Sequence, residues 1–314
     1  MIRILSSWLV ASWLLGFAFV GGLSAQEEKA VKEEAPAKIV ILAGRPSHPP
    51  RMHEFRAGSH LLESCLKDRT DVAVTVVENG WPKDEKVFDN AAAIIFYMDG
   101  GGGHEVVKED GRRKKFIDEL AKQGGGLGFM HFGVEVVADQ AGAEFKDWIG
   151  GHYEHMFSCN PIWEPVFDTF PEHPITEGVK PFKIKDEWYM NMRFVADIPG
   201  NEKTEVEGLK FQPILVASPS DEVRDGPYVY PRGPYSHIQA NKGRAEAMMW
   251  CVERPDGGRG FGFTGGHFHD NWKDDNFRKV VLNGLLWTAK VKVPEGGVPS
   301  SVTDEQMDMN LDKK

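Results

Sequence analysis

The chain has 314 residues, of which 41% are hydrophobic and 27% charged, and its formal net charge at pH 7 is −10. The 37 lysines and arginines are scattered along the sequence, so no segment offers the basic face that a nucleic-acid backbone requires. We therefore expect no nucleic-acid partner. A chain of this length can form the hydrophobic core of one α/β domain with long loops.

Three cysteines, Cys65, Cys159 and Cys251, lie far apart in the sequence. An odd number allows at most one disulfide and leaves a free thiol, and no CxxC pair is present that would indicate a zinc site of that type. We expect these residues to be buried apolar side chains.

The N-terminal segment has the pattern of an export signal. Arg3 precedes an apolar run over residues 4–22, and small residues follow up to Ala25. We predict a signal peptide at 1–25 and an exported protein, periplasmic or secreted, with an uncleaved membrane anchor as the alternative. Beyond that segment we expect no membrane contact. Residues 26–37 are charged and lack aromatic residues, which predicts a disordered tether.

The next part of the chain alternates short apolar, β-branched runs with amphipathic segments. We predict strands at residues 38–43, 73–77, 91–98 and 124–132, and helices at residues 53–66 and 114–123. This alternation predicts an α/β fold with a doubly wound, mostly parallel sheet, in which ligands bind beyond the carboxyl ends of the strands.

The middle of the chain, residues 148–247, is rich in proline, glycine and aromatic residues and has little helical periodicity. We expect long loops and short antiparallel strands that cover the site. A strand at 259–264 and a helix at 275–289 complete the predicted domain, which spans residues 38–298. A polar C-terminal tail at 299–314 follows.

Four ordered motifs carry a resemblance to a known family. They are GGGLGFMHFG at 124–133, DWIGGHYEHM at 147–156, HPITEGVKPFKIKDEWY at 173–189 and GGRGFGFTGGHFHDNW at 257–272. Together they resemble the ThuA-like (trehalose-utilisation) family, which implies the flavodoxin-like fold of class I glutamine amidotransferases. Where those enzymes carry a nucleophilic cysteine on a sharp strand-to-helix turn, this chain has His131. An imidazole is a poor replacement for a thiolate, so glutamine amidotransferase chemistry is disfavoured.

Several strand-end residues are candidates for the site. His131 is one, and Glu135, four residues later, can orient its imidazole or serve a helix N-terminus. In GGHFH, His267 and His269 are two apart and point to one side of an extended stretch. The family resemblance implies a catalytic histidine in this segment.

The loops after the first and third strands add further polar residues. The loop GRPSHPPRMHEF supplies His48, His53 and Glu54, which we expect to contact substrate. Asp99 opens a glycine-rich loop whose backbone N–H groups can approach a ligand oxygen, although its spacing does not match a nucleotide-binding motif.

Two adjacent acids in DEWY at 186–189 point to opposite sides of the chain, so only one can enter the site, and we choose Glu187. Tyr189 is a further substrate-binding candidate. Aromatic side chains can stack on a sugar ring or belong to the core. The aromatic residues open to either role are Trp163, Trp188, Tyr189 and Trp272.

Two or three imidazoles with a carboxylate can hold a divalent metal such as zinc, and His131, Glu187 and His267 are the candidates. No HExxH motif is present. The resemblance implies an enzyme that processes a sugar derivative such as a 3-keto glycoside, for example 3-keto-trehalose, by hydrolysis, elimination or isomerisation. His131, Glu187 and His267 are the candidate catalytic residues for acid–base chemistry on such a ligand. The alternative is a non-catalytic carbohydrate-binding or accessory protein on the same fold. The sequence leaves the oligomeric state open.

Overall fold

The computed structural model of the chain describes residues 35–195 and 203–314. The predicted signal peptide and nearly all of the predicted tether lie outside the described residues. Among the helices of the described ranges, none combines the length and the apolar character that crossing a membrane requires.

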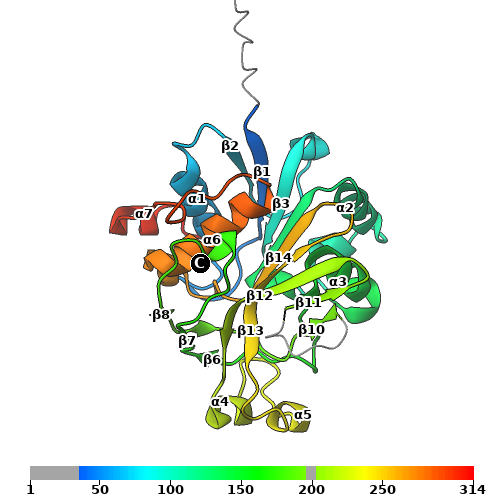
Figure 1. The fold of residues 1–314 in the computed structure, drawn as a ribbon, viewed down its shortest axis with the longest axis vertical. Coiled ribbons are helices and arrows are strands. Elements are labelled where there is room, and N and C mark those ends of the chain that lie inside the picture. The colour runs from blue at the N-terminus through cyan, green and yellow to red at the C-terminus, as the bar shows by residue number, and fades with distance from the viewer. Residues whose placement is uncertain (1–34, 196–202) are drawn as a thin grey trace, which may run out of the picture. The chain divides into compact units, whose positions relative to one another are not determined.

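Parallel strands form one side of an eight-stranded sheet (Figure 1). Their spatial order is β2-β1-β3-β4-β14, which is the flavodoxin-like arrangement, so the predicted fold class is confirmed. These strands are β1 (Ala37–Ala43), β2 (Val72–Val77), β3 (Ala91–Tyr97), β4 (Gly126–Met130) and β14 (Arg259–Phe263).

The sheet continues beyond β14 with antiparallel strands that the sequence analysis did not assign to it. They are β13 (Glu246–Glu253), β12 (Leu209–Ala217) and β11 (Thr204–Val206). The register of β12 shifts just after Pro213, because proline cannot donate a hydrogen bond to the ladder. A proline in the middle of a run is a poor sign of an internal strand, which explains why this part of the sheet was missed.

The two faces of the sheet carry separate hydrophobic clusters, and β1 contributes to both. Ile39 and Ile41 point to the face covered by α1 (Phe55–Leu66) and α6 (Asp275–Thr288). Val40 and Leu42 point to the opposite face, covered by α2 (Arg112–Lys122) and α3 (Ala143–Ile149). Alternate residues of a strand face opposite sides, so a strand covered on both sides is apolar throughout.

Residues 150–195 form a covering segment of short antiparallel pairs. These are β5 (Gly151–His152) with β10 (Arg193–Phe194), β6 (Ile162–Trp163) with β9 (Asp186–Glu187), and β7 (Val166–Phe167) with β8 (Phe182–Lys183). This segment agrees with the expected loops and short strands. Between β12 and β13 the chain forms a lobe with two short helices, α4 (Asp221–Asp225) and α5 (Ser236–Gln239), which projects below the sheet in Figure 1.

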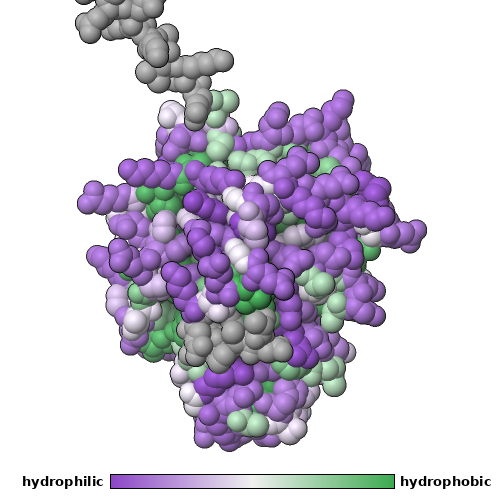
Figure 2. Space-filling model, turned by 45° about the vertical axis from the view of Figure 1, so that its right-hand side comes forward, coloured by the Kyte–Doolittle hydropathy of each residue, from purple (hydrophilic) through white to green (hydrophobic). Residues whose placement is uncertain are grey.

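The C-terminal residues pack on the domain. Residues 299–314 include α7 (Asp304–Asp308), which begins with a capping box formed by Thr303 and Gln306 and buries Met307. On the face drawn in Figure 2, hydrophilic residues dominate and apolar residues occur only in small separate patches.

Candidate metal centre

The candidate site lies at the carboxyl edge of the parallel strands. The chain leaves β1 into the loop that bears His53, and it leaves β3 at Met98 and Asp99. His131 directly follows β4, and His267 follows β14 after Thr264 and two glycines. Parallel strands deliver the residues after them to one edge, which explains why segments so distant in sequence meet here.

Three imidazole nitrogens and one carboxylate oxygen converge on a common point. His53 Nε2 lies 2.9 Å from His131 Nε2 and 2.9 Å from His267 Nδ1, and the last two atoms are 3.3 Å apart. Glu187 Oε2 lies 2.8 Å from His267 Nδ1 and 3.6 Å from His131 Nε2. All four side chains are buried. We refer to them as the four-residue cluster.

Hydrogen bonds outside the cluster fix the tautomers of two of these histidines. His131 Nδ1 lies 2.9 Å from the carbonyl oxygen of Thr264, and His53 Nδ1 lies 2.8 Å from Asp99 Oδ1. A carbonyl or carboxylate oxygen only accepts, so each Nδ1 carries the proton and each neutral ring presents an Nε2 lone pair to the cluster. Burial lowers the pKa of both imidazoles well below the usual value, which disfavours a second proton.

Two lone pairs facing each other at 2.9 Å repel unless a cation lies between them. The distances suit a metal ion. With metal–ligand bonds of about 2.1 Å, neighbouring ligand atoms are about 3.0 Å apart in an octahedral site and about 3.4 Å apart in a tetrahedral one. The five separations given above, 2.8–3.6 Å, span this range, and all four ligand atoms lie within 4.8 Å of one another. Three imidazoles with one carboxylate suit zinc and other divalent transition metals.

A second layer of residues holds the ligand set. Asn160 Nδ2 donates to Glu187 Oε1 at 2.7 Å, which leaves Oε2 to face the histidines. Asp186 Oδ1 accepts from the backbone N–H of His267 at 3.1 Å, and its Oδ2 accepts from that of Gly266 at 2.8 Å. Of the two adjacent acids, Glu187 therefore enters the cluster and Asp186 fixes the backbone of the His267 loop. Such outer partners orient ligands and set their basicity.

The backbone at this edge is strained. His131 has a φ of 51°, His53 of 48° and His48 of 61°, in the left-handed region that side chains with a Cβ rarely adopt. At Gly100 a Cβ would lie 2.1 Å from the carbonyl oxygen of Phe132, so only glycine allows the Asp99 loop to approach the His131 turn. Strained backbone persists where the surrounding structure enforces it, and it concentrates at functional sites.

His48 lies at the outer side of the cluster. Its exposed ring stacks on that of His53 at a centroid distance of 3.5 Å, and its Nδ1 is 3.1 Å from Ser47 Oγ. His48, His53 and Asp99 form a second group whose possible ligand atoms lie close together. The site therefore has one imidazole open to solvent beside the buried ones.

Glu135 does not orient His131, because both ring nitrogens of His131 have other partners. Its carboxyl group instead lines a cavity of about 500 Å³ together with the glycine loop (Gly101 and Gly102) and residues 136–139, Glu154 and His155. It makes no side-chain hydrogen bond to the part of the chain that the structure describes. Burial, reinforced by the negative charge of Glu187, raises the pKa of Glu135 to about 7.

Some predicted site residues lie elsewhere. Glu54 accepts backbone N–H bonds from Arg51 at 2.9 Å and Asp312 at 2.7 Å, so it ties the first loop to the C-terminus. His269 Nε2 donates to the carbonyl oxygen of Met307 at 2.8 Å, away from the cluster. All the candidate stacking residues are buried, namely Trp163, Trp188, Tyr189 and Trp272. The ring of Tyr189 packs 5.2 Å from that of His131.

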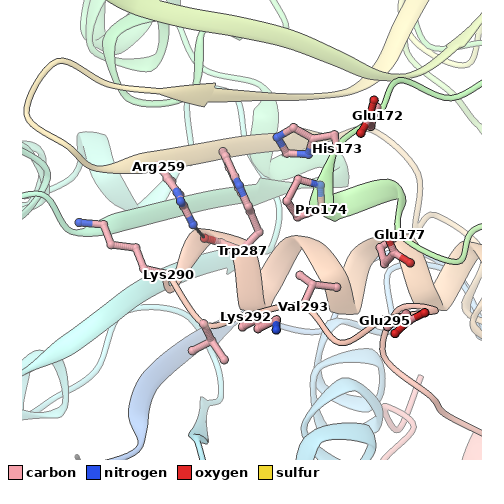
Figure 3. Close-up of a pocket in the computed structure, with 11 residues that line it drawn as sticks. Glu172, His173, Pro174, Glu177, Arg259, Trp287, Lys290, Lys292, Val293 and Glu295 are labelled. Carbon is pink, nitrogen blue, oxygen red and sulfur yellow. Dashed lines mark hydrogen bonds between the residues drawn. The ribbon is translucent and has the colours of Figure 1, made fainter.

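A larger cavity, of about 750 Å³, lies at the opposite edge of the sheet (Figure 3). Its lining includes Arg259, the first residue of β14, and Trp287 near the end of α6. Arg259 stacks over the Trp287 ring at 4.9 Å, and His173 packs against the same ring. Neither this cavity nor the one lined by Glu135 has a member of the four-residue cluster in its lining, but only the latter lies with the strand-end loops. In open parallel sheets the reactive edge is the carboxyl one, so we place the chemistry at the cluster.

The sequence reasoning missed two features of the site. It assigned His53 to substrate binding, whereas the structure places its Nε2 among the ligand atoms of the cluster. It also missed Asn160, which no motif distinguishes. The position of His53 in the loop after the first strand was an available signal that it lies near His131, because both loops leave the sheet at the same edge.

Comparison with known proteins gives a consistent result. The ThuA family, described as trehalose utilisation, matches residues 38–288. A ThuA-like protein from Bacteroides uniformis is 13% identical, with a TM-score of 0.55 over 83% of this chain and 94% of its own. One from Parabacteroides merdae is 17% identical, with a TM-score of 0.52 over 86% of this chain and 94% of its own. At these identities the likeness shows the fold. No curated protein matches the chain.

Proposed function

The chain belongs to the ThuA family, and we propose that it is a divalent-metal-dependent enzyme that processes a sugar derivative such as a 3-keto glycoside. The observation that carries the proposal is the four-residue cluster, in which three imidazole nitrogens and a carboxylate oxygen converge with two tautomers fixed for metal binding. Its ligands would be His53 Nε2, His131 Nε2, His267 Nδ1 and Glu187 Oε2.

This assignment changes the roles expected of the cluster residues. His131, Glu187 and His267 were candidates for moving protons, but a side chain that binds a metal through its lone pair cannot act as a base at the same atom. A bound metal would polarise a ketone oxygen and stabilise the enolate that forms when a neighbouring C–H bond breaks. Proton transfer then falls to groups outside the cluster.

Glu135 is the best-placed group for that transfer. It lines the cavity of about 500 Å³, and its carboxyl group is close enough to Glu187 for their charges to interact. Burial favours the protonated form of Glu135, which suits a group that accepts a proton and then returns it. The carboxylate would take the proton from the carbon beside the ketone. In an elimination the same proton passes to the departing glycosidic oxygen, and addition of water across the new double bond then completes a hydrolysis. In an isomerisation the proton returns to the sugar at another atom.

The test combines metal analysis with turnover. The purified mature domain should contain stoichiometric divalent metal, and it should convert 3-keto-trehalose or methyl 3-keto-glucoside in a reaction followed by NMR. His53→Ala and Glu187→Ala should lose both metal and turnover. His60→Ala should lose neither, because His60 binds Glu63 and Glu78 at the surface.

Two results would overturn the proposal. Turnover that survives complete removal of metal would exclude metal dependence. Binding of the sugar without turnover, by the metal-loaded protein, would favour the accessory carbohydrate-binding protein instead.

We also propose that the protein is exported, on the strength of the residues at 1–25 alone. Mass spectrometry of protein from the native host should then find a mature N-terminus near Ala25 or Gln26. An intact Met1 in a detergent fraction would indicate the membrane anchor.

A further inference from the structure

Exposed apolar side chains gather next to the candidate site. Among the described residues, Tyr230 is 70% exposed, Met156 is 56% exposed and Val229 is 42% exposed. These make up half of the large hydrophobic side chains that are exposed in that part of the chain. An exposed aromatic residue is unusual enough to need a reason when other exposed apolar groups surround it.

The sheet places Tyr230 at the same edge as the metal ligands. Ala217 at the end of β12 pairs with Glu246 at the start of β13, and Met249 pairs with Phe263 at the end of β14. The connection over residues 218–245 therefore leaves the sheet beyond the carboxyl end of β14, which is where the chain runs on to His267. This connection is the lobe with α4 and α5 (Figure 1).

Asn160 links Tyr230 directly to the cluster. Its Nδ2 donates to Glu187 Oε1 at 2.7 Å, and its Oδ1 accepts from the backbone N–H of Tyr230 at 3.1 Å. The backbone N–H of Val229 also donates to the carbonyl oxygen of Asn160, at 3.2 Å. One residue thus separates a proposed metal ligand from the backbone of Tyr230. These bonds hold the exposed ring at a fixed position relative to the metal centre.

His155 connects Tyr230 to the cavity that holds Glu135. The rings of His155 and Tyr230 lie 5.9 Å apart, and His155 lines that cavity with Glu135 and Glu154. A ligand whose reacting ring lies beside Glu135 would therefore extend past His155 toward Tyr230.

We propose that Tyr230 and His155 form a binding platform for the second ring of a glycoside, the sugar or aglycone on the far side of the bond that reacts. This inference rests on the proposed function, and it predicts that glycosides with a ring-sized leaving group bind more tightly than those without one. The flat apolar face of Tyr230 packs against the C–H face of a ring, while its hydroxyl and the imidazole can bond to ring hydroxyls.

Other occupants fit the patch less well. A stable protein partner covers about 800 Å² on each side of its interface, with a packed hydrophobic centre. Here the apolar groups are few, and the Tyr230 ring lies 5.9 Å from that of His155, which lines a polar cavity with Glu135 and Glu154. That composition suits a small ligand with many hydroxyl groups.

The experiment compares a disaccharide with a glycoside that lacks the second ring. Tyr230→Ala should raise KM for 3-keto-trehalose about 3- to 10-fold, the range expected for losing one aromatic contact. The same variant should leave kcat and all parameters for methyl 3-keto-glucoside unchanged, because the platform binds substrate and transition state equally. Tyr230→Phe keeps the aromatic ring, so its KM for 3-keto-trehalose should stay close to that of the unaltered protein. Val166→Ala removes another exposed apolar side chain, on β7, which is 55% exposed, and serves as the control.

A second measurement separates this inference from the proposed function. Saturation-transfer NMR on the metal-free protein should detect unoxidised trehalose, and the signal should fall in Tyr230→Ala but not in Val166→Ala. If no keto-glycoside is converted and this binding difference remains, the platform holds and the proposed reaction fails. If turnover is present but Tyr230→Ala affects both substrates equally or neither, the platform is wrong.

Discussion

Replacing Asp99 with alanine tests how the structure prepares His53 to bind a metal. Asp99 Oδ1 lies 2.8 Å from His53 Nδ1 and keeps the proton on that nitrogen, so Nε2 is free to bind. Without the carboxylate, the ring can carry its proton on Nε2 instead, and it loses the charge that increases its basicity. The ligand itself remains in place, so Asp99→Ala isolates the contribution of the outer partner.

The expected loss is 10- to 100-fold in metal affinity, or about 1.4–2.8 kcal/mol, as for other outer partners of ligating histidines. Asp99→Asn keeps an acceptor but removes the charge, so its loss should be smaller. Asn160→Ala acts on a different ligand, through the 2.7 Å bond to Glu187 Oε1, and should cost a similar amount. Since both ligands would bind the same metal, the double variant should depart from the product of the two single losses, and that departure measures their coupling.

Competition with a chromophoric zinc chelator at neutral pH measures these affinities, and circular dichroism checks that each variant is folded. His53→Ala provides the reference for losing the ligand entirely. If Asp99→Ala binds zinc as tightly as the unaltered protein while His53→Ala does not, His53 remains a ligand, but the role of Asp99 in fixing its tautomer is refuted.

Three further predictions concern stability and the thiols. Saturating zinc, at about 1,000 times its Kd, should stabilise the fold by about 4 kcal/mol, so EDTA should lower Tm by on the order of 10 °C in calorimetry; an unchanged Tm would contradict a bound metal. Burial lowers the pKa of His104 to about 4 and that of His152 to about 4. Between pH 6.5 and 4 the unfolded state therefore binds protons that the folded state does not. Urea titrations of the metal-free protein should show that the free energy of unfolding decreases as the pH is lowered through this range, by up to about 1.4 kcal/mol per pH unit for each histidine. His104→Gln should reduce that slope, and an unchanged slope would contradict the assignment. Burial raises the pKa of Cys159 and Cys251 well above the usual value, so iodoacetamide should label the half-buried Cys65 first in peptide mass spectra without loss of zinc binding or turnover; inactivation by that label would point to thiol chemistry.

The central part of the fold was predictable because its pattern is local. The apolar runs of β1 and β3 are buried on both faces. After β1 comes a segment with helical periodicity, and after β3 comes a glycine-rich loop. The antiparallel extension was not predictable in the same way. β12 contains Pro213 at its irregularity, and β13 pairs with strands whose positions depend on the tertiary fold. Local propensity does not carry that information.

The site was predictable to the extent that strand ends determine it. His131, His267 and Asp99 follow strands, and the strand-end rule was enough to select them. For His53 the sequence indicated only a position at this edge, because its role as a ligand depends on which ring nitrogen faces Asp99. The aromatic residues stayed open to either role for a related reason: sequence does not distinguish the buried Trp188 from the exposed Tyr230, since exposure is a property of the assembled fold.

Glu187 shows why the cluster needs the covering segment as well as the sheet. The histidines come from strand ends whose positions the sheet fixes, whereas Glu187 belongs to β9, in the segment that lies over that edge. Asp186, its neighbour, bonds to the backbone of Gly266 and His267, so the residue pair secures the covering segment to the His267 loop while delivering the carboxylate. A metal bound by all four residues would therefore join the sheet edge to its cover, and Asn160 would extend that connection to the lobe that carries Tyr230. The position of the Glu187 carboxylate and that of the Tyr230 backbone therefore depend on the same residue, Asn160.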